Sequence, residues 1–389
     1  MNGEKRKLPR NVVIVALVAL ASGFGQDLIT PILPGFLTLL GVSAAGIGLI
    51  DGLLNGATSV FRFISGILSD YFKNRKWFVF FGYALSSIAR PLLALANSFG
   101  AVAVLRTLDG VGKGSKDAPR DALIADSVGI EISGRAFGFH RLVDTLGSVF
   151  GPLTAAFILL SLTPSLESYR IIFGLAAVPG LITLLLIAFR VREPEKSENV
   201  VSQERGALPK MFWFFAFGMT FAMLFKINDS LFLLRAGEIG ISNELIPALF
   251  AGFTFIYALA SYPIGILSDR FGKLPFIVSG WLLLSIVELG FSFAPSLYFG
   301  LALFALYGLF FALSEGSGRA IIADIVPQNL RGRAYAIFHT LVGLSVIFGG
   351  YFLGRVWDNS SSQSAFLIAS IGSFIGFLIF GFIYFSNNK

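Results

Sequence analysis

The chain has 389 residues, of which 55% are hydrophobic and only 14% are charged, and its mean hydropathy is +0.77. This composition excludes a water-soluble enzyme and is typical of a protein embedded in a lipid bilayer. The absence of cysteine excludes a disulfide framework, a thiolate nucleophile and a cysteine zinc site.

Twelve membrane spans are predicted along the chain. A helix needs about 20 mostly apolar residues to cross the hydrocarbon core, and turn and charge clusters divide the chain into segments of that length. The first segment follows a basic stretch like that of a signal peptide, but its apolar run is too long for one, which predicts an uncleaved span. The predicted spans of this all-α membrane protein are 11–36, 44–69, 77–97, 99–120, 135–160, 169–189, 211–234, 244–268, 275–294, 297–319, 333–356 and 364–385.

The basic residues predict the orientation of these spans. The net charge of +7 does not indicate a nucleic-acid partner, because in a membrane protein the position of Lys and Arg matters more than their sum. Most of the 30 Lys and Arg lie before the first span, after the last or in even-numbered loops, and only Arg170, Arg235 and Arg355 fall in odd-numbered loops. Both termini are therefore expected in the cytoplasm, and the protein in the cell membrane.

A polar stretch at 191–210 divides the spans into six and six. It is rich in charge and poor in aromatic residues, which predicts a flexible cytoplasmic linker. We expect a six-helix bundle at 1–190 and a second one at 211–389, in a monomer.

The two predicted bundles repeat each other in sequence. Blocks matched at an offset of 198 or 199 residues are SGILSDYF (65–72) with IGILSDRF (264–271), ALIADSV (122–128) with AIIADIV (320–326), GRAF (134–137) with GRAY (332–335), and LGVS (40–43) with IGIS (239–242). Four blocks in one register indicate a duplication. Pseudo-symmetric six-span halves of parallel orientation are typical of transporters that bind solute near the bilayer midplane, between halves that rock about it.

Two sets of motifs resemble those of the major facilitator superfamily. GILSDRFGK at 265–273 resembles its cytoplasmic loop signature, and GILSDYFKNRK at 66–76 is a looser copy. RTLDGVG at 106–112 resembles its fourth-helix motif. The resemblance covers essentially the whole chain, and implies the fold of that superfamily and secondary active transport.

The fifth span is similar to the motif of antiporter branches of the same superfamily. The similarity rests on Gly138, Gly147, Gly151 and Pro152, although Ala-Ala follows where Gly-Gly is usual. These four residues are expected to let the fifth helix pack closely and bend. The resemblance connects this segment with closing a leak during exchange.

Ionisable residues occur where contact with lipid is costly. Those inside or at the edges of the predicted spans are Arg62, Arg90, Arg106, Lys113, Lys116, Arg141, Lys226, Asp27, Asp51, Asp109, Asp117, Asp144, Asp229, Glu288 and Glu315. A charge at the bilayer centre costs about 3 kcal/mol. We therefore expect these residues to face one another or a wet cavity.

The fourth span carries a stripe of charges. Arg106, Asp109, Lys113, Lys116 and Asp117 recur at three- and four-residue steps, which places them on one face of a helix. One interpretation is a ladder of ion pairs that holds this half together, and the other, which we favour, is a wall of the solute cavity. Arg106 is the first candidate for solute contact or for control of a nearby carboxylate's proton. The predicted solute-binding residues are Arg106, Asp109, Lys113, Asp117, Arg62, Arg90, His140, Arg141 and Asp144.

Acidic residues in the first and seventh spans are the candidates for coupling to protons. Asp27 lies mid-span just before two prolines, and Asp229 holds the corresponding place after Lys226. A carboxyl group in such a cavity can load and release a proton during the transport cycle. The alternative is a permanently ionised partner of a nearby Arg, or of Lys226 in the case of Asp229. Asp109 completes the predicted proton-coupling set.

A histidine near the start of the fifth span has two interpretations. His140 and Asp144 share a helix face, a spacing that can hold a divalent metal. Because no third convergent ligand is evident, we favour a hydrogen-bonded or proton-relay histidine and expect no metal and no cofactor.

Polar residues at the cytoplasmic ends of the spans are expected to form gates. Asp70 and Asp269 end the second and eighth spans, where each can cap a helix of the opposite half and pair with Arg333 or Arg135. The resemblance implies the same role, since this loop controls the inward-closed state in the superfamily. The predicted gating set is Asp70, Asp269, Arg270, Lys273, Asp126, Asp324, Arg135 and Arg333.

These features predict a secondary active transporter rather than an enzyme, since the sequence contains no nucleotide-binding P-loop and no plausible catalytic triad. The leading hypothesis is export of a small amphiphilic or toxic solute in exchange for protons. An uptake symporter for a charged metabolite or metal chelate is the alternative, because the cavity contains many charges. A membrane sensor or lipid-handling protein is a third, and it predicts that neutralising Asp27 or Arg106 leaves solute flux unchanged.

Overall fold

Every regular element that the computed structural model describes is a helix, within residues 8–72, 74–128, 132–193, 206–327 and 330–387. The helices are α1 (Arg10–Ile29), α2 (Leu33–Leu39), α3 (Ala44–Phe72), α4 (Arg75–Leu92), the 3₁₀ turn η1 (Leu93–Leu95), α5 (Phe99–Asp126), α6 (Ser133–Leu162), α7 (Leu166–Leu175), α8 (Ala177–Arg190), α9 (Lys210–Phe225), α10 (Asp229–Glu238), α11 (Ile246–Phe271), α12 (Leu274–Phe293), α13 (Leu297–Ile325), α14 (Arg331–Asn359) and α15 (Ser362–Asn387).

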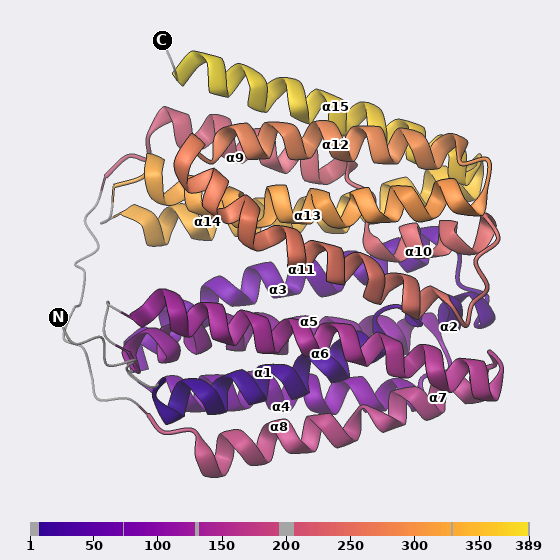
Figure 1. The fold of residues 1–389 in the computed structure, drawn as a ribbon, viewed down its shortest axis with the longest axis horizontal. Helices are drawn as coiled ribbons and strands as arrows, with labels where there is room; N and C mark the ends of the chain where they lie inside the picture. The colour runs from indigo at the N-terminus through magenta and orange to yellow at the C-terminus, as the bar shows by residue number, and fades with distance from the viewer. Residues whose placement is uncertain (1–7, 73, 129–131, 194–205, 328–329, 388–389) are drawn as a thin grey trace.

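Eleven helical stretches in the described ranges are long and apolar enough to cross a membrane. They coincide within a few residues with eleven of the twelve predicted spans. The remaining prediction, 99–120, falls in α5, whose first 18 residues already contain four charged side chains. Because α5 is as long as its neighbours and lies among them (Figure 1), polarity rather than length sets it apart. The twelfth crossing stays a prediction.

Two sets of helices lie side by side, α1 to α8 in one set and α9 to α15 in the other (Figure 1). They meet along two seams, where α3 packs against α14 and α6 packs against α11. The beginning of α1 and the end of α15 lie at one end of the molecule, together with the end of α8 and the beginning of α9. We call this the linker end, and the opposite one the far end.

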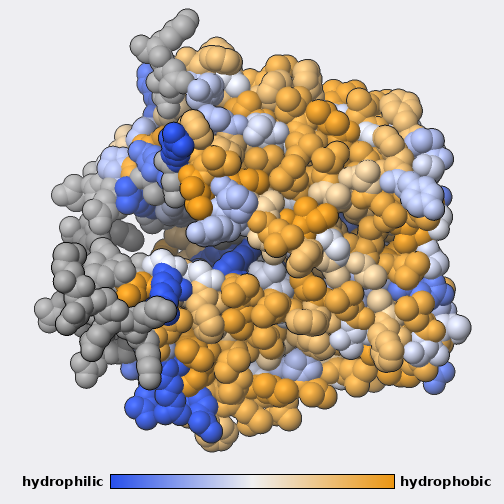
Figure 2. Space-filling view, in the orientation of Figure 1, coloured by the Kyte–Doolittle hydropathy of each residue, from blue (hydrophilic) through white to orange (hydrophobic). Residues whose placement is uncertain are grey.

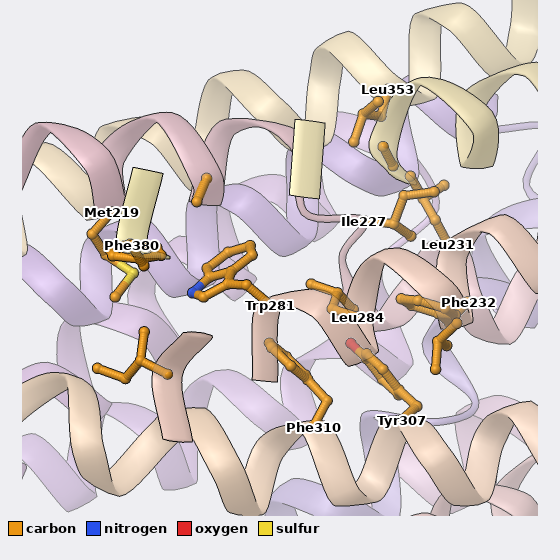
Figure 3. Close-up of a cluster of buried hydrophobic side chains, with 14 of the residues drawn as sticks. Met219, Ile227, Leu231, Phe232, Trp281, Leu284, Tyr307, Phe310, Leu353 and Phe380 are labelled. Atoms are coloured by element: carbon orange, nitrogen blue, oxygen red, sulfur yellow. The ribbon is translucent and has the colours of Figure 1, made fainter. Parts of the chain in front are cut away.

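Each set has its own apolar core. In the second set Trp281, Phe232, Tyr307 and Phe380 are fully buried and pack with aliphatic side chains from neighbouring helices (Figure 3). The first set has two smaller cores, one of them built around Phe36 and its aromatic neighbours. The sets are therefore stabilised separately and joined at the two seams.

Glycines bring α3 and α14 into backbone contact. A Cβ atom on Gly48 would lie 2.1 Å from the carbonyl oxygen of Gly350, and one on Gly354 would lie 2.5 Å from that of Ala44. Such an approach between membrane helices requires small residues. These contacts lie in the far-end halves of both helices, so this seam is closed at the far end.

The outer surface between the two ends is mainly hydrophobic (Figure 2). Large apolar side chains such as Phe157, Phe189 and Phe382 are exposed there, as expected for side chains that face lipid. Figure 2 also shows a hollow between the two sets that opens toward the linker end and has hydrophilic side chains in its depth. Because the seam of α3 and α14 is closed at the far end, we take this hollow as the route to the buried charges.

The first predicted span, 11–36, is broken rather than continuous. α1 ends at Ile29 and α2 begins at Leu33, with Pro31 between them and Pro34 in the first turn of α2. Proline lacks the amide hydrogen that continues a helix and is tolerated in a first turn, which explains the break.

The predicted span 211–234 is broken at the corresponding place, between α9 and α10, without a proline. The backbone is extended at Lys226, and the amide of Ile227 donates to Oε1 of Glu288 at 3.1 Å. The side chain of Asn228 caps α10 by accepting from the amide of Leu231 at 3.2 Å. Side-chain oxygens thus accept from the backbone N–H groups that the break leaves without a helical partner. Sequence periodicity does not reveal such a break.

Candidate functional site

A buried ion-pair cluster occupies the middle of the first set. Asp109 of α5 accepts from Nε of Arg90 at 3.1 Å and from Nη1 of Arg106, also at 3.1 Å. The side chains are almost fully buried, at 1% exposure for Arg106 and 3% for Arg90. Arg90 also donates to the carbonyl oxygen of Ser22 and to Oε1 of Gln26. One carboxylate therefore balances two guanidinium groups, which makes Asp109 a structural centre of the site.

Asp27 lies beside this cluster on α1 but outside its ion pairs. Its carboxylate accepts from Nε2 of the Gln26 side chain at 3.2 Å and lies near Ser148 of α6. It is 6% exposed and makes no ion pair with any residue in the described ranges. The charges of Lys113 and Asp144 act on it from α5 and α6. Asp27 is therefore a buried acid that no fixed cation holds in its ionised form.

A second charged cluster lies further along α5 toward the linker end. Asp117 pairs with Arg62 of α3, with Lys116 at 3.3 Å and with Arg120 at 3.4 Å. The Lys116 ammonium also lies 4.4 Å from the centre of the Tyr83 ring. The ion-pair interpretation thus holds for Asp109 and Asp117, with partners on α3 and α4 as well as on α5.

Lys113 differs from the other charges of the stripe on α5. It forms no ion pair or hydrogen bond with the described residues, although the charges of Asp117 and Asp27 act on it. The predicted links from Asp109 to Lys113 and from Lys113 to Asp117 are therefore absent in this state. A partly exposed ammonium without a hydrogen-bonded partner is available for a solute or for Asp27.

The start of α6 carries three predicted residues, one of which lies at the seam with α11. Arg141 donates to the hydroxyl group of Tyr257 on α11 and lies 5.4 Å from the centre of that ring. Asp144 lies against Gly23 of α1. His140 is buried, with no hydrogen-bond partner for Nε2. Among the described residues no three His, Cys, Asp or Glu side chains converge on a metal position.

The helix break of the second set forms the facing wall. Lys226 Nζ donates to the hydroxyl group of Tyr307 at 3.1 Å and lies 3.7 Å from Asp229, which accepts from the same hydroxyl group. Asp229 is thus ion-paired, as the alternative interpretation of the sequence expects. Glu288 is fully buried and accepts from Ser373 at 2.6 Å as well as from the break.

Two acids have roles that sequence reasoning missed. Glu288 stabilises the break, and the only signal for it was an acid inside a strongly apolar span. Asp51 of α3 is 6% exposed, and its Oδ2 has no hydrogen-bond partner in the described structure. The charges of Arg106 in its own set and of Lys226 and Asp229 in the other act on it. Asp51 therefore links the charges of the two sets.

Two ion pairs at the linker end repeat between the sets. Arg75 pairs with Asp126, and Lys273 Nζ lies 2.9 Å from Asp324, so both partners are related by the same offset of 198 residues. These pairs join helices within one set.

Three further predicted gating residues lie at the linker end. Arg270 lies over the ring of Phe271, Arg333 donates to the carbonyl oxygen of Gly206 at 3.2 Å, and Arg135 is exposed. The side chains of Asp70 and Asp269 fall outside the described residues.

The motif glycines of α6 pack on the helix that carries Asp27. A Cβ atom on Gly147 would lie 2.3 Å from the carbonyl oxygen of Leu20, and one on Gly151 would lie 2.4 Å from that of Phe24. Pro152 follows inside the same helix. Gly138 corrects the prediction, because nothing lies within 4 Å of its Cβ position and it makes no close helix contact in this state.

This difference predicts unequal effects of one substitution at two positions of α6. Gly147→Ala is expected to destabilise the protein by about 1–3 kcal/mol, because the backbone of α1 must move. Gly138→Ala is expected to change stability by less than about 1 kcal/mol. Thermal unfolding of both variants in detergent micelles measures the difference, and equal melting temperatures would contradict the packing described here.

The sequence profile of the Major Facilitator Superfamily matches residues 15–234 and again residues 211–389. The chain belongs to the major facilitator superfamily. An uncharacterized MFS-type transporter from Methanocaldococcus jannaschii is 32% identical over 98% of this chain and 97% of that protein. A probable 4-methylmuconolactone transporter from Cupriavidus pinatubonensis is 23% identical over 83% of this chain and 79% of that one.

A solved structure agrees with this assignment at the level of the fold. The crystal structure of a bacterial homolog of the human lysosomal transporter Spinster, inward-facing and occupied, superposes with a TM-score of 0.76 and 17% identity over 96% of each chain.

The membership confirms several predictions made from the sequence. The chain has the all-helical fold of this superfamily and is a multi-pass integral membrane protein. It is a secondary active transporter of small-molecule solutes rather than an enzyme.

Proposed function

We propose that this transporter exports a small amphiphilic or toxic solute in exchange for protons, by alternating access, with Asp27 as the proton carrier. The observation that carries the proposal is the difference between Asp27 and the acids of the site that form ion pairs. Asp109, Asp117 and Asp229 all have ion-pair partners, whereas Asp27 is buried and forms no ion pair with the described residues. An acid without a fixed countercharge can gain and lose a proton while the surrounding ion pairs persist.

The position of Asp27 between α1 and α6 supports exchange rather than uptake. It lies near Ser148, which follows Gly147, where α6 packs on the backbone of α1. This segment of α6 is the one that resembles the antiporter motif. Movement of α6 during the cycle therefore changes the surroundings of Asp27 directly.

The solute is proposed to bind in the hollow between the two sets. Lys113 and Arg141 reach it from the first set, and Lys226 and Asp229 from the second, with Arg106 and Asp109 behind them. Arg62, Arg90, His140, Asp144 and Asp117 shape the wall. Tyr257 offers an aromatic ring and a hydroxyl group on the facing side, and buried Tyr307 positions Lys226 and Asp229.

The remaining sequence predictions complete the proposal. α5 is the twelfth span, the linker end with both termini faces the cytoplasm, and the protein acts as a monomer in the cell membrane. Residues 1–190 and 211–389 move as two bundles joined by 191–210. Asp70, Asp269 and the basic residues near them close the linker end when the transporter faces outward. Gly147, Gly151 and Pro152 give α6 its close packing.

Uptake of an organic metabolite is the second candidate function. The observation that favours it is the relative whose name, probable 4-methylmuconolactone transporter, indicates a small organic solute. In that case Asp27 carries its proton together with the solute rather than against it.

The test is tolerance and efflux in cells that express the protein. Wild type and Asp27→Asn, at matched expression, are challenged with a panel of toxic amphiphiles and metal salts. Tolerance and energised efflux are expected with wild type only. Greater sensitivity on expression of the wild type would contradict export and support uptake.

A further inference from the structure

We infer that Asn228 and Asp358 clamp the beginning of α3 and hold the far end shut, and that Asn228 ties this clamp to the polar cluster at the break in the second set. The inference rests on alternating access alone. It is independent of the transport direction and of proton coupling.

The first point of the clamp is a helix cap that crosses between the two sets. Asp358, at the end of α14, accepts from the backbone amides of Ala44 at 2.9 Å and of Ala45 at 3.0 Å. These amides open the first turn of α3 and have no partner within that helix. A carboxylate at a helix N-terminus is stabilised by both amides and by the helix dipole.

The second point lies one turn deeper and is buried. The side-chain nitrogen Nδ2 of Asn228 donates to the carbonyl oxygen of Gly48 at 3.1 Å, and Asn228 is 5% exposed. The other end of the same side chain accepts from the amide of Leu231 and so caps α10. One amide group therefore holds α10 and α3 together.

Asn228 is also the residue that joins the clamp to the solute-facing wall. It stands between Lys226 and Asp229, which share the hydroxyl group of Tyr307. A solute or ion that displaces this cluster moves the break between α9 and α10. The Asn228 donor moves with the break and is pulled away from Gly48.

The clamp can exist only in one arrangement of the two sets. Its donors and acceptors lie on α3 on one side and on α10 and α14 on the other, at the far end of the glycine-packed seam. Rocking of the sets that opens the far end separates both pairs of partners. Loss of a clamp bond is therefore expected to favour the state that is open at the far end.

The experiment uses distances between spin labels, because the chain has no cysteine of its own. Thr38 and Asn243 are exposed and line a far-end cavity of about 430 Å³ from opposite sets. The distance between spin labels at Thr38→Cys and Asn243→Cys measures opening of the far end. The distance between labels at Phe72→Cys and Gly332→Cys measures opening of the linker end of the α3 and α14 seam. The full chain is measured in detergent micelles without added solute.

Asn228→Ser keeps a side chain able to cap α10 but removes the donor to Gly48. We expect the ratio of far-end-open to far-end-closed molecules to rise about fivefold or more, as for loss of a buried hydrogen bond. Distances at the linker end are expected to shorten at the same time. Asp358→Ala is expected to act in the same direction and more weakly, since Asp358 is exposed.

Asn74→Ser is the matched control, because the cap that Asn74 forms on α4 lies within the first set. It is expected to leave both distance distributions unchanged. Unchanged far-end distances in Asn228→Ser and Asp358→Ala would overturn the inference, and so would broadening at both ends, which indicates a loosened fold. If Asn228→Ser does not fold, Asp358→Ala alone decides the question.

Discussion

Proton-driven transport is expected to disappear when Asp27 is replaced by asparagine, while the folded protein persists. The substitution keeps the shape of the side chain and the oxygen that accepts from the Gln26 side chain. It leaves no buried cation without its ion-pair partner, so the free energy of unfolding is expected to change by no more than about 1 kcal/mol. What the variant loses is the group that carries the proton.

The measurement uses everted membrane vesicles and a solute identified in the tolerance panel. Accumulation driven by a pH gradient is expected to fall to the level of vesicles without the protein. Exchange of labelled for unlabelled solute, which needs no net proton movement, is expected to continue. Asp121→Asn is the control, since Asp121 pairs with Arg120 and is not among the proposed solute-binding or proton-coupling residues, and it is expected to retain coupling. Coupled accumulation by Asp27→Asn would remove Asp27 from the mechanism.

The same substitution at Asp109 is expected to have the opposite outcome, with loss of the fold rather than of coupling alone. Asp109→Asn leaves Arg90 and Arg106 buried without a countercharge. Breaking a buried ion pair by removing one partner costs about 3–5 kcal/mol, a large part of a protein's total stability. We expect little folded protein in the membrane and a strongly lowered melting temperature.

Asp121→Asn is the matched control for this prediction. Asp121 also pairs with an arginine, Arg120, but its side chain is 51% exposed. Solvent already screens such a pair, so its loss is expected to change stability by less than about 1 kcal/mol. Yield after solubilisation, size-exclusion profile and melting temperature compare the two variants. Similar values for both would show that Asp109 is not the centre of the buried cluster.

Much of the fold follows from the sequence because membrane spans have a strong signal. Apolar runs of the right length identify eleven of the stretches that the structure contains. The repeated blocks identify the symmetry, and the offset of 198 residues recurs in the ion pairs of Arg75 with Asp126 and Lys273 with Asp324. The spans depend on composition and the duplication depends on the spacing of the repeated blocks, and a single sequence contains both kinds of information.

The partners of individual charges do not follow from the sequence, because they depend on contacts between helices. The spacing on α5 predicted neighbours within that helix, whereas Arg90 comes from α4 and Arg62 from α3. The break at Lys226 has no proline to signal it and is stabilised by Glu288 from α12. In the sequence Asn228 and Asp358 look like other polar residues, because their roles depend on contacts with α3 that only the structure shows.

The polarity of α5 has a consequence for how the protein enters the membrane. On a biological insertion scale each Asp, Lys or Arg near the centre of a helix opposes insertion by about 2.5–3.5 kcal/mol, so α5 is a poor substrate for the translocon when it is alone. Its countercharges, Arg90 and Arg62, lie on α4 and α3, which are synthesised first. We expect α5 to leave the translocon only when it is already paired with α3 and α4. Its insertion into the bilayer then depends on these neighbouring helices rather than on its own hydrophobicity.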